Sequence, residues 1–205
     1  MQPSPRPGEK RARLAPEVRR DQILAVAAKM VLDQGCLPLN LEALARAAGI
    51  SKALVYAVFG DQHALFNALL EQDLRALAAR GVADASMLGG LHEAALGCAL
   101  AYFEHVAATG PLIHVILRDP YMAGQVDPAV AAARDRVVRR LARLAREELR
   151  LPAKEAIAAI NLIITIPEEA GRLVKAGTLS PERGRLLCRE LVESSLEALS
   201  PQVNA

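Results

Sequence analysis

The sequence is poor in aromatic residues and in cysteine. Tryptophan is absent, and aromatic residues make up only 3% of the 205-residue chain. The three cysteines, Cys36, Cys98 and Cys188, are widely separated, and no two of them have metal-ligand spacing. An odd and dispersed set of cysteines argues against a disulfide framework and fits a reducing cytoplasm. We therefore expect a cytoplasmic protein that holds no metal.

The sequence also lacks membrane-spanning runs and catalytic motifs. No apolar run approaches the roughly 20 residues that span a bilayer, and the N-terminal segment has no apolar signal core. There is no HExxH pair, no phosphate-binding glycine loop and no nucleophile elbow, and the four histidines are dispersed. These absences predict a protein that is not an enzyme, needs no cofactor and has no membrane partner.

What the sequence does contain favours helices throughout. Hydrophobic residues make up 52% of the chain and charged residues 23%, which is ordinary for a protein with a full core. The helix formers Ala, Leu, Arg and Glu dominate, and no alternating β-branched run is long enough to nominate a strand. The expected fold class is all-α.

Positive charge is concentrated near the N-terminus. The net charge of the chain is only +2, but residues 1–60 hold nine Lys and Arg against five Asp and Glu, whereas residues 61–205 hold 16 against 18. This bias favours phosphate contact at the N-terminal end. Residues 1–16 are basic and rich in proline, which predicts a disordered tail or, alternatively, a flexible arm that contacts DNA.

Residues 40–59 have the pattern of two short helices joined by a tight turn. Asn40 and Ser51 each stand where an N-cap belongs, and Gly49 suits the left-handed conformation that ends a helix. The apolar residues recur at spacings of 3 and 4 in both helices, as Leu41, Leu44 and Ala45, then Val55, Val58 and Phe59. This arrangement, with a partly basic leading edge on the second helix, indicates a DNA-reading helix-turn-helix.

The same segment resembles the DNA-binding unit of TetR-type transcriptional regulators, the tetracycline-repressor family. The resemblance is carried by Leu44-Ala45, Ala48-Gly49-Ile50-Ser51, Tyr56, Phe59 and Leu65. It extends over residues 18–77, and beyond them only length and helical character agree. It implies a repressor that binds a palindromic double-stranded DNA operator as a homodimer and is released by a small-molecule effector.

Seven residues of the motif are expected to contact DNA: Asn40, Arg46, Ser51, Lys52, Ala53, Leu54 and Tyr56. Lys52, Ala53 and Leu54 lie at the end of the second helix that enters the major groove. The lysine can donate to guanine or to phosphate, whereas the other two offer apolar contact only. The matching family tyrosine implies that the Tyr56 hydroxyl contacts a phosphate, and the caps and Arg46 are further phosphate candidates.

Three positions depart from the family pattern. Val58 replaces a histidine or aromatic residue, Ala53 replaces a common glycine, and Gln62 replaces a lysine expected at the start of the next helix. The last change removes one phosphate charge and its salt-dependent affinity. These departures keep open a second interpretation, a helical small-molecule-binding protein with weak or lost DNA binding.

We divide the chain into a tail, a DNA-binding head and a body: residues 1–16, 17–80 and 81–205. The head has three helices around the helix-turn-helix and a bridging fourth at 61–80. The body is a helical ligand-binding and dimerisation domain, with helices expected at 91–108, 112–117, 127–149, 153–175 and after Ser180-Pro181. Pro167 implies a kink or an early break in the fourth of these. The last two helices are apolar around most of their circumference. The resemblance implies that the protein dimerises through them, and the alternative is that both helices are buried within the monomer.

The resemblance also implies a ligand pocket in the body. The candidate lining residues are Tyr102, Phe103, Val106, Ile113, Leu117, Tyr121, Met122, Asn161 and Thr165. Asn161, Thr165 and Glu168 recur on one face of an apolar helix, where they orient a ligand or bond across the dimer. A row of arginines between residues 136 and 150 is interpreted as a solvated face, with a surface for an acidic ligand or a second nucleic-acid surface as alternatives.

Overall fold

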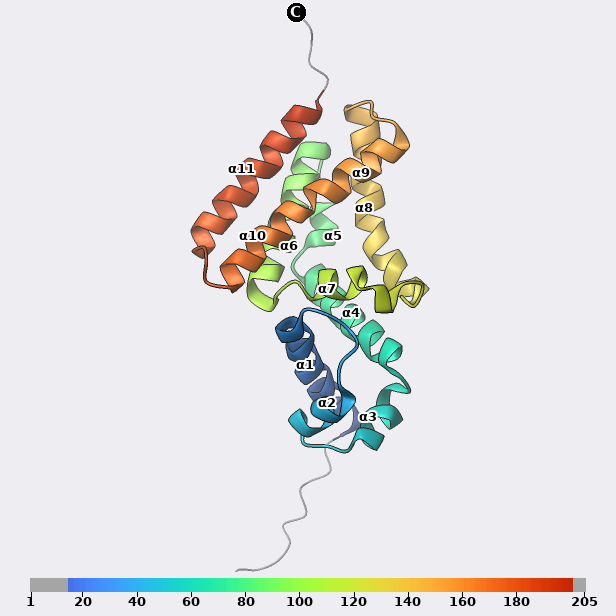
Figure 1. The fold of residues 1–205 in the computed structure, drawn as a ribbon. Helices are drawn as coiled ribbons and strands as arrows, with labels where there is room; N and C mark the ends of the chain where they lie inside the picture. Colours follow the sequence, from blue (N-terminus) through green and yellow to red (C-terminus); the bar gives the residue numbers. More distant parts are fainter. Residues whose placement is uncertain (1–14, 201–205) are drawn as a thin grey trace, which may run out of the picture.

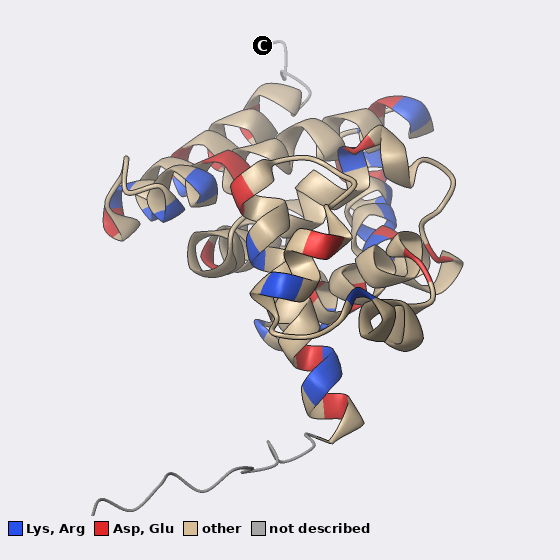
Figure 2. Cartoon of the chain, turned by 60° about the horizontal axis from the view of Figure 1, so that its bottom comes forward, with Lys and Arg blue, Asp and Glu red and all other residues tan. Residues whose placement is uncertain are grey.

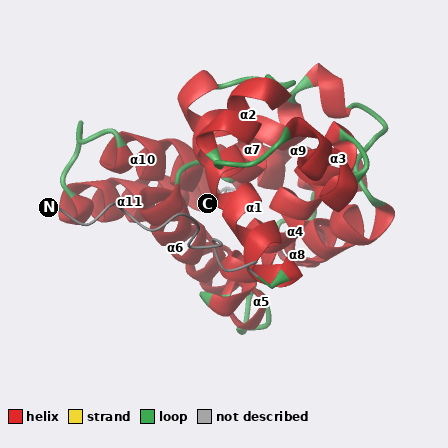
Figure 3. Ribbon diagram, turned by 90° about the horizontal axis from the view of Figure 1, so that it is seen from below, coloured by secondary structure: helices red, strands yellow, loops and turns green. Residues whose placement is uncertain are grey.

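The computed structural model describes residues 15–200, and the expected tail lies almost wholly outside them. This part of the chain is helical and contains no strand (Figures 1 and 3). The elements are α1 Pro16–Gln34, α2 Leu41–Ala47, α3 Lys52–Phe59, α4 Gln62–Ala79, α5 Val82–Ala85, α6 Leu91–Thr109, α7 Leu112–Arg118, the short 3-10 helix η1 Pro120–Met122, α8 Pro128–Glu148, α9 Ala153–Ile163, α10 Thr165–Lys175 and α11 Pro181–Leu199. The predicted all-α fold class is confirmed.

One feature of the body differs from the predicted helices, and a second agrees with the break that Pro167 implied. The single-turn helix α5 lies in a stretch for which no helix was expected. The predicted helix at 153–175 is divided into α9 and α10, which meet at a turn on Ile164. The break follows from Pro167, which has no N–H to bond the carbonyl of Ile163 one turn earlier. The Thr165 hydroxyl also donates to the Leu162 carbonyl at 2.6 Å.

The helix α4 connects the head to the body, and it is drawn between them in Figure 1. Its first half buries Leu65, Phe66, Leu69 and Leu70 completely or almost completely in a core shared with α1, α2 and α3. That core continues into the body, where it includes residues of α6, α7 and η1. The apolar packing around α4 therefore runs across the predicted boundary at residue 80.

A second set of contacts holds the head against the segment after α7. The Asp119 carboxylate accepts from the backbone N–H of Leu37 at 2.7 Å and from that of Tyr121 at 2.9 Å. The Tyr121 ring stacks on His63 of α4, with 4.5 Å between ring centroids. Asn67 of α4 bonds to the backbone of Gln125 and Asp127. The head is thus tied to the body on two sides.

The second core lies among α6, α8, α9, α10 and α11. Here α10 and α11 approach α6 closely because each presents a glycine to it. A Cβ at Gly171 would lie 2.7 Å from Cβ of Val106 and 2.9 Å from the carbonyl oxygen of Phe103. A Cβ at Gly184 would lie 3.1 Å from the Phe103 ring. Phe103 and Val106 therefore serve as the packing surface for the last two helices.

We expect Gly171→Ala to destabilise the protein by about 1–3 kcal/mol, because the added methyl group meets backbone as well as side chain and neither can move cheaply. Alanine is a better helix former than glycine by roughly 1 kcal/mol, so helix propensity alone predicts that the substitution stabilises the protein. Urea unfolding followed by circular dichroism measures the difference. A variant as stable as the wild type, or more stable, would contradict the close packing described here.

Candidate nucleic-acid interface and ligand cavity

The turn between α2 and α3 is fixed by its caps and by one contact from α1. The Asn40 side chain accepts from the N–H groups of Glu42 and Ala43 at 2.9 and 3.1 Å, and the Ser51 hydroxyl accepts from Leu54 N–H at 3.2 Å. Gly49 has φ of 65°, which a residue with a Cβ rarely adopts. Gln22 of α1 donates to the Ala48 carbonyl at 3.1 Å. These bonds set the angle between the two helices.

One face of α3 is anchored and the other is free. Val55 and Phe59 are buried against the head core, and the Arg20 guanidinium lies 5.5 Å from the centre of the Phe59 ring. The opposite side of the helix presents exposed residues, among them Tyr56, whose side chain is 46% exposed. A helix held by one side in this way offers its other side to a major groove.

The seven residues predicted to contact DNA are placed in two groups. Asn40, Arg46, Ser51, Lys52, Ala53 and Tyr56 are exposed, whereas Leu54 is half-buried. Asn40 and Ser51 are helix caps, so their hydroxyl or amide oxygen is already engaged with the backbone. The Lys52 ammonium lies 3.2 Å from the Glu42 carboxylate in a solvent-exposed pair. Such a pair contributes little to stability, and a phosphate can replace the carboxylate.

The basic bias of the N-terminal end comes mainly from outside the described residues. Residues 1–14 hold four Lys and Arg against one Glu, whereas residues 15–60 hold five against four. Figure 2 shows basic and acidic segments interspersed over the face that it turns forward, rather than one continuous basic band. Few positive charges in the helix-turn-helix itself are therefore available for phosphate contact.

Gln62, at the position where a lysine was expected, has a defined structural partner. Its side-chain oxygen accepts from the backbone N–H of Leu39 at 3.0 Å, just before α2 begins. This bond connects the start of α4 to the segment that leads into the helix-turn-helix. A lysine has no acceptor and cannot make it.

A cavity of about 590 Å³ lies in the body, beside the second half of α4. Leu74, Leu77 and Ala78 of α4 form part of its wall, and α5, α6, α7, α8, α9 and α10 form the rest. Most of the lining is apolar. The volume falls within the roughly 300–1,000 Å³ that is typical of small-molecule sites. An occupant of this cavity contacts the helix that carries the DNA-binding head.

The comparison with protein families decides the nature of the head. A family model described as bacterial regulatory proteins of the tetR family matches residues 23–69, which contain the buried part of α1, all of α2 and α3, and the start of α4. The head is a TetR-family DNA-binding domain. The predicted family is confirmed, and with it a DNA-binding domain.

The likeness to solved structures extends over most of the chain. A TetR-like transcriptional regulator from a Rhodococcus species is 21% identical to this chain, with a TM-score of 0.68. The match covers 90% of this chain and 97% of the Rhodococcus chain. PfmR of Thermus thermophilus, a TetR-family regulator, is 20% identical with a TM-score of 0.64 and coverages of 85% and 97%. A TetR-family regulator from Bordetella parapertussis is 18% identical with a TM-score of 0.62 and coverages of 90% and 95%. At these identities the likeness establishes the fold.

No curated protein matches the sequence. Within residues 15–200 no single helix is long and apolar enough to cross a membrane, and α6 and α7 meet that test only as a pair bent by 93°. No group of three or more His, Cys, Asp or Glu residues in the same range could hold a metal ion.

The nine residues predicted to line a ligand pocket in the body fall into two sets. Tyr102, Ile113, Leu117 and Asn161 lie on the cavity wall. The other five do not line this cavity: Phe103, Val106, Tyr121, Met122 and Thr165.

Packing explains where those five lie. Phe103 and Val106 face α10 and α11, and Tyr121 packs against His63 and Phe66. Met122 is buried in the core shared with the head, and the Thr165 hydroxyl donates to the Leu162 carbonyl in the last turn of α9.

Sequence reasoning overlooked the contributions of α4 and α8 to the cavity. The apolar residues of α4 were assigned to the bridge between head and body alone. On α8, Arg134, Arg136 and Arg140 line the cavity, whereas Arg143 does not. The row of arginines therefore serves two environments, and only its N-terminal part fits the alternative of a surface for an acidic ligand.

The polar groups at one end of the cavity are paired with one another. The Glu168 carboxylate lies 2.5 Å from Nδ1 of His114 and accepts from the Tyr102 hydroxyl at 3.2 Å. Burial and the neighbouring Glu168 carboxylate both raise the pKa of Tyr102 well above its ordinary value, so the phenol stays protonated and acts as a donor. Glu168 is thus satisfied by two partners.

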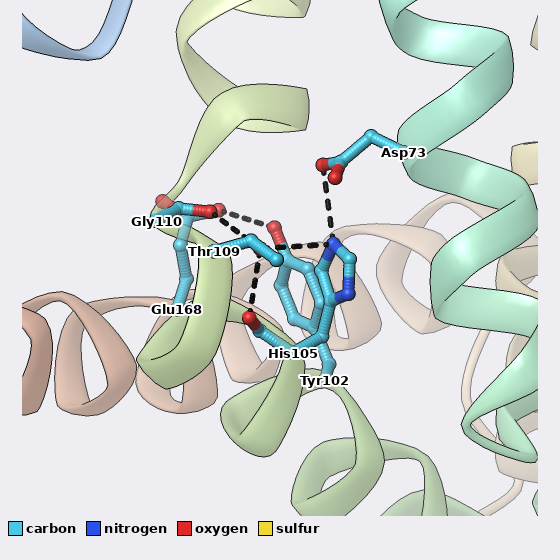
Figure 4. A network of polar contacts seen from close by, with 6 residues as sticks. All are labelled: Asp73, Tyr102, His105, Thr109, Gly110 and Glu168. Atoms are coloured by element: carbon cyan, nitrogen blue, oxygen red, sulfur yellow. Dashed lines mark hydrogen bonds and ion pairs between the residues drawn. The ribbon is translucent and has the colours of Figure 1, made fainter. Parts of the chain in front are cut away.

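A second polar contact joins α4 directly to α6, one turn beyond Tyr102. Nε2 of His105 lies 3.1 Å from the Asp73 carboxylate, and both residues are buried. Figure 4 shows Asp73 reaching from α4 to His105, with Tyr102 and Glu168 beside them. The Thr109 hydroxyl donates to the His105 carbonyl at 2.8 Å. Among residues 15–200, Oδ2 of Asp73 and Nδ1 of His105 have no hydrogen-bond partner, so the pair is a close contact of two buried groups rather than a satisfied hydrogen bond. A shift of either helix would separate the two groups.

The thiols are expected to differ sharply in reactivity. Burial raises the pKa of Cys98, on the cavity wall, to about 12 and that of Cys188 to about 11. Both thiols therefore stay protonated near neutral pH. Cys36, in contrast, is exposed. Because the thiolate is the nucleophile, one thiol per chain should react rapidly with a disulfide reagent at pH 8, and three should react after unfolding. Cys36→Ser should remove the rapid phase. Two or more rapid thiols in the native protein would contradict the burial of Cys98 and Cys188.

Proposed function

We propose that this TetR-family regulator is a ligand-responsive repressor that binds a palindromic operator as a homodimer and releases it when a small molecule enters the cavity. The observation that carries the proposal is the double role of α4. Phe66 and Leu69 pack inside the head, and two turns later Leu74 and Leu77 line the cavity. A ligand and the DNA-reading helix are therefore in contact with one rigid element.

The proposed mechanism is a displacement of α4. A ligand that presses on Leu74, Leu77 and Ala78 moves the C-terminal half of α4, and the N-terminal half carries the head with it. In a dimer the two heads must read half-sites about 34 Å apart, so a small rotation of each head removes the match. The ligand shifts the equilibrium only if it binds the released arrangement more tightly than the DNA-bound one. The Asp73–His105 pair resists such a movement until the ligand supplies that difference.

The surfaces of the last helices support the homodimer. Leu162, Ile166, Glu169 and Leu173 recur at spacings of 4, 3 and 4 along α9 and α10, and Leu187, Leu191, Ser194 and Ala198 recur in the same way along α11. None of these eight residues is buried within the chain, and Leu162 and Leu191 are 70% and 52% exposed. Two stripes of mostly apolar and small side chains, with Glu169 as the one charged member, suit a four-helix contact with a second copy of the chain.

We expect Tyr56→Phe and Lys52→Ala each to weaken DNA binding about three- to tenfold, because each removes one hydrogen bond or ion pair to phosphate. Lys52→Ala should also lower the slope of log affinity against log salt concentration by about one. Fluorescence anisotropy with DNA from upstream of the protein's own gene measures both quantities.

Two matched variants serve as controls for this experiment. Lys154→Ala removes an exposed lysine far from the head, and Tyr121→Phe removes a hydroxyl at the junction between head and body. Both should bind DNA as the wild type does. Wild-type affinity in Tyr56→Phe and Lys52→Ala alike would contradict the assignment of α3 as the reading helix.

Leu162→Glu combined with Leu191→Glu should convert the protein to a monomer, because four carboxylates would be buried without partners in the dimer. Light scattering after size exclusion should give half the mass of the wild type. Val18→Glu, which changes an equally exposed apolar residue on α1, is the control and should leave the mass unchanged. A double variant that stays dimeric would place the contact elsewhere.

A second candidate is a helical small-molecule-binding protein with weak or lost DNA binding. It is favoured by Gln62 and by the small excess of basic residues in residues 15–60. The two candidates differ in one observation, which is salt-dependent binding to a palindromic fragment at low ionic strength.

A further inference from the structure

The charged residues on the cavity wall are strongly unbalanced. Four arginines, Arg118, Arg134, Arg136 and Arg140, face one carboxylate, that of Glu168. Glu168 is engaged by His114 and Tyr102 rather than by any of the arginines. An excess of guanidinium groups beside an apolar space attracts an anion.

The arginines have few partners of their own. Among residues 15–200, no carboxylate lies within 4.0 Å of Arg118, Arg136 or Arg140, and the contact of Arg134 with Asp135 is long, at 3.9 Å. Nε of Arg140 is buried and has no hydrogen-bond partner in the same range. A buried N–H without an acceptor costs free energy, which an acceptor atom from a ligand would recover.

The rest of the cavity is suited to a hydrocarbon. Leu74 and Leu77 of α4, Ala95 and Ala99 of α6 and Ile160 of α9 line it. The cationic residues come chiefly from α8, which also lines the cavity with Val137, Val138 and Leu141. A mostly apolar lining with a few cationic groups suits a ligand with a charged end and an apolar body.

We propose that the ligand of this cavity is an amphipathic carboxylic acid, whose carboxylate is held by Arg140 and Arg136 and whose apolar body lies against α4 and α6. Guanidinium groups bind a planar carboxylate through paired hydrogen bonds, and these bonds are strong because both partners are charged. The proposal rests on the proposed function, since it names the chemical class of the molecule that would release the DNA. The apolar body then contacts the helix that must move.

The test compares three probes with the same twelve-carbon chain, dodecanoate, dodecanol and dodecyltrimethylammonium, by calorimetry below the concentrations at which they form micelles. Dodecanoate should bind at least about tenfold more tightly than the other two, the difference expected for one charge-assisted pair. Arg140→Met should remove this advantage and leave dodecanol binding unchanged. Arg143→Met is the matched control on the same helix and should change nothing.

Several results would overturn the proposed ligand class. These are equal binding of dodecanol and dodecanoate, tighter binding of the cation, no binding of any probe, and unchanged dodecanoate affinity in Arg140→Met. A parallel measurement of DNA release separates this proposal from the proposed function. Dodecanoate that binds without releasing DNA supports the ligand class and contradicts release. Release of DNA by dodecanol or by dodecyltrimethylammonium supports release by a small molecule and contradicts the ligand class.

Discussion

The helix α4 is a structural part of two separate packing units, and the arrangement of the whole molecule depends on that. Its first half cannot leave the head, because Leu65 and Phe66 are fully buried there. Its second half closes the cavity with Leu74 and Leu77. An α-helix is stiff over its 18 residues, so the two halves move together. Burial thus places one element in contact with both the cavity and the core that holds the DNA-reading helix.

The other contacts around α4 limit how it moves. On one side Asp73 meets His105 of α6, and on the other Asn67 and His63 meet the segment after α7. These are polar or stacking contacts with defined geometry, unlike the apolar packing between them. Packed interfaces of this kind favour discrete arrangements over continuous deformation. The head is therefore held in one orientation relative to the body, and a change of orientation requires several of these contacts to be replaced together.

The local parts of this structure were predictable from sequence, and the long-range parts were not. The caps at Asn40, Ser51 and Asp61 and the apolar spacing around them fix α2, α3 and α4 within a few residues, because each signal acts within one turn of helix. The cavity could not be predicted in the same way. Phe103 follows Tyr102 directly, yet the first packs against α11 and the second lines the cavity. Adjacent helical residues point about 100° apart, and only the placement of the other helices decides which side faces the cavity.

The arginines of α8 show the same limit. Their spacing on an amphipathic helix indicates a solvated face, and Arg143 is indeed exposed. Arg140, one turn earlier, lines the cavity with a buried donor, because the turn of α8 that carries it faces the cavity. Likewise, Gln62 is a departure from a family pattern in the sequence, but its bond to Leu39 gives it a structural role.

The central claim is that the state of the cavity controls DNA affinity through α4. Ala99→Phe tests it most directly, because this substitution fills the cavity from α6 without touching the head. Affinity for a DNA fragment bound by the wild type should fall at least about tenfold, while Ala108→Phe, on the exposed side of the same helix, should have no effect. Equal affinity in wild type and Ala99→Phe, with the cavity shown to be filled, would contradict the account.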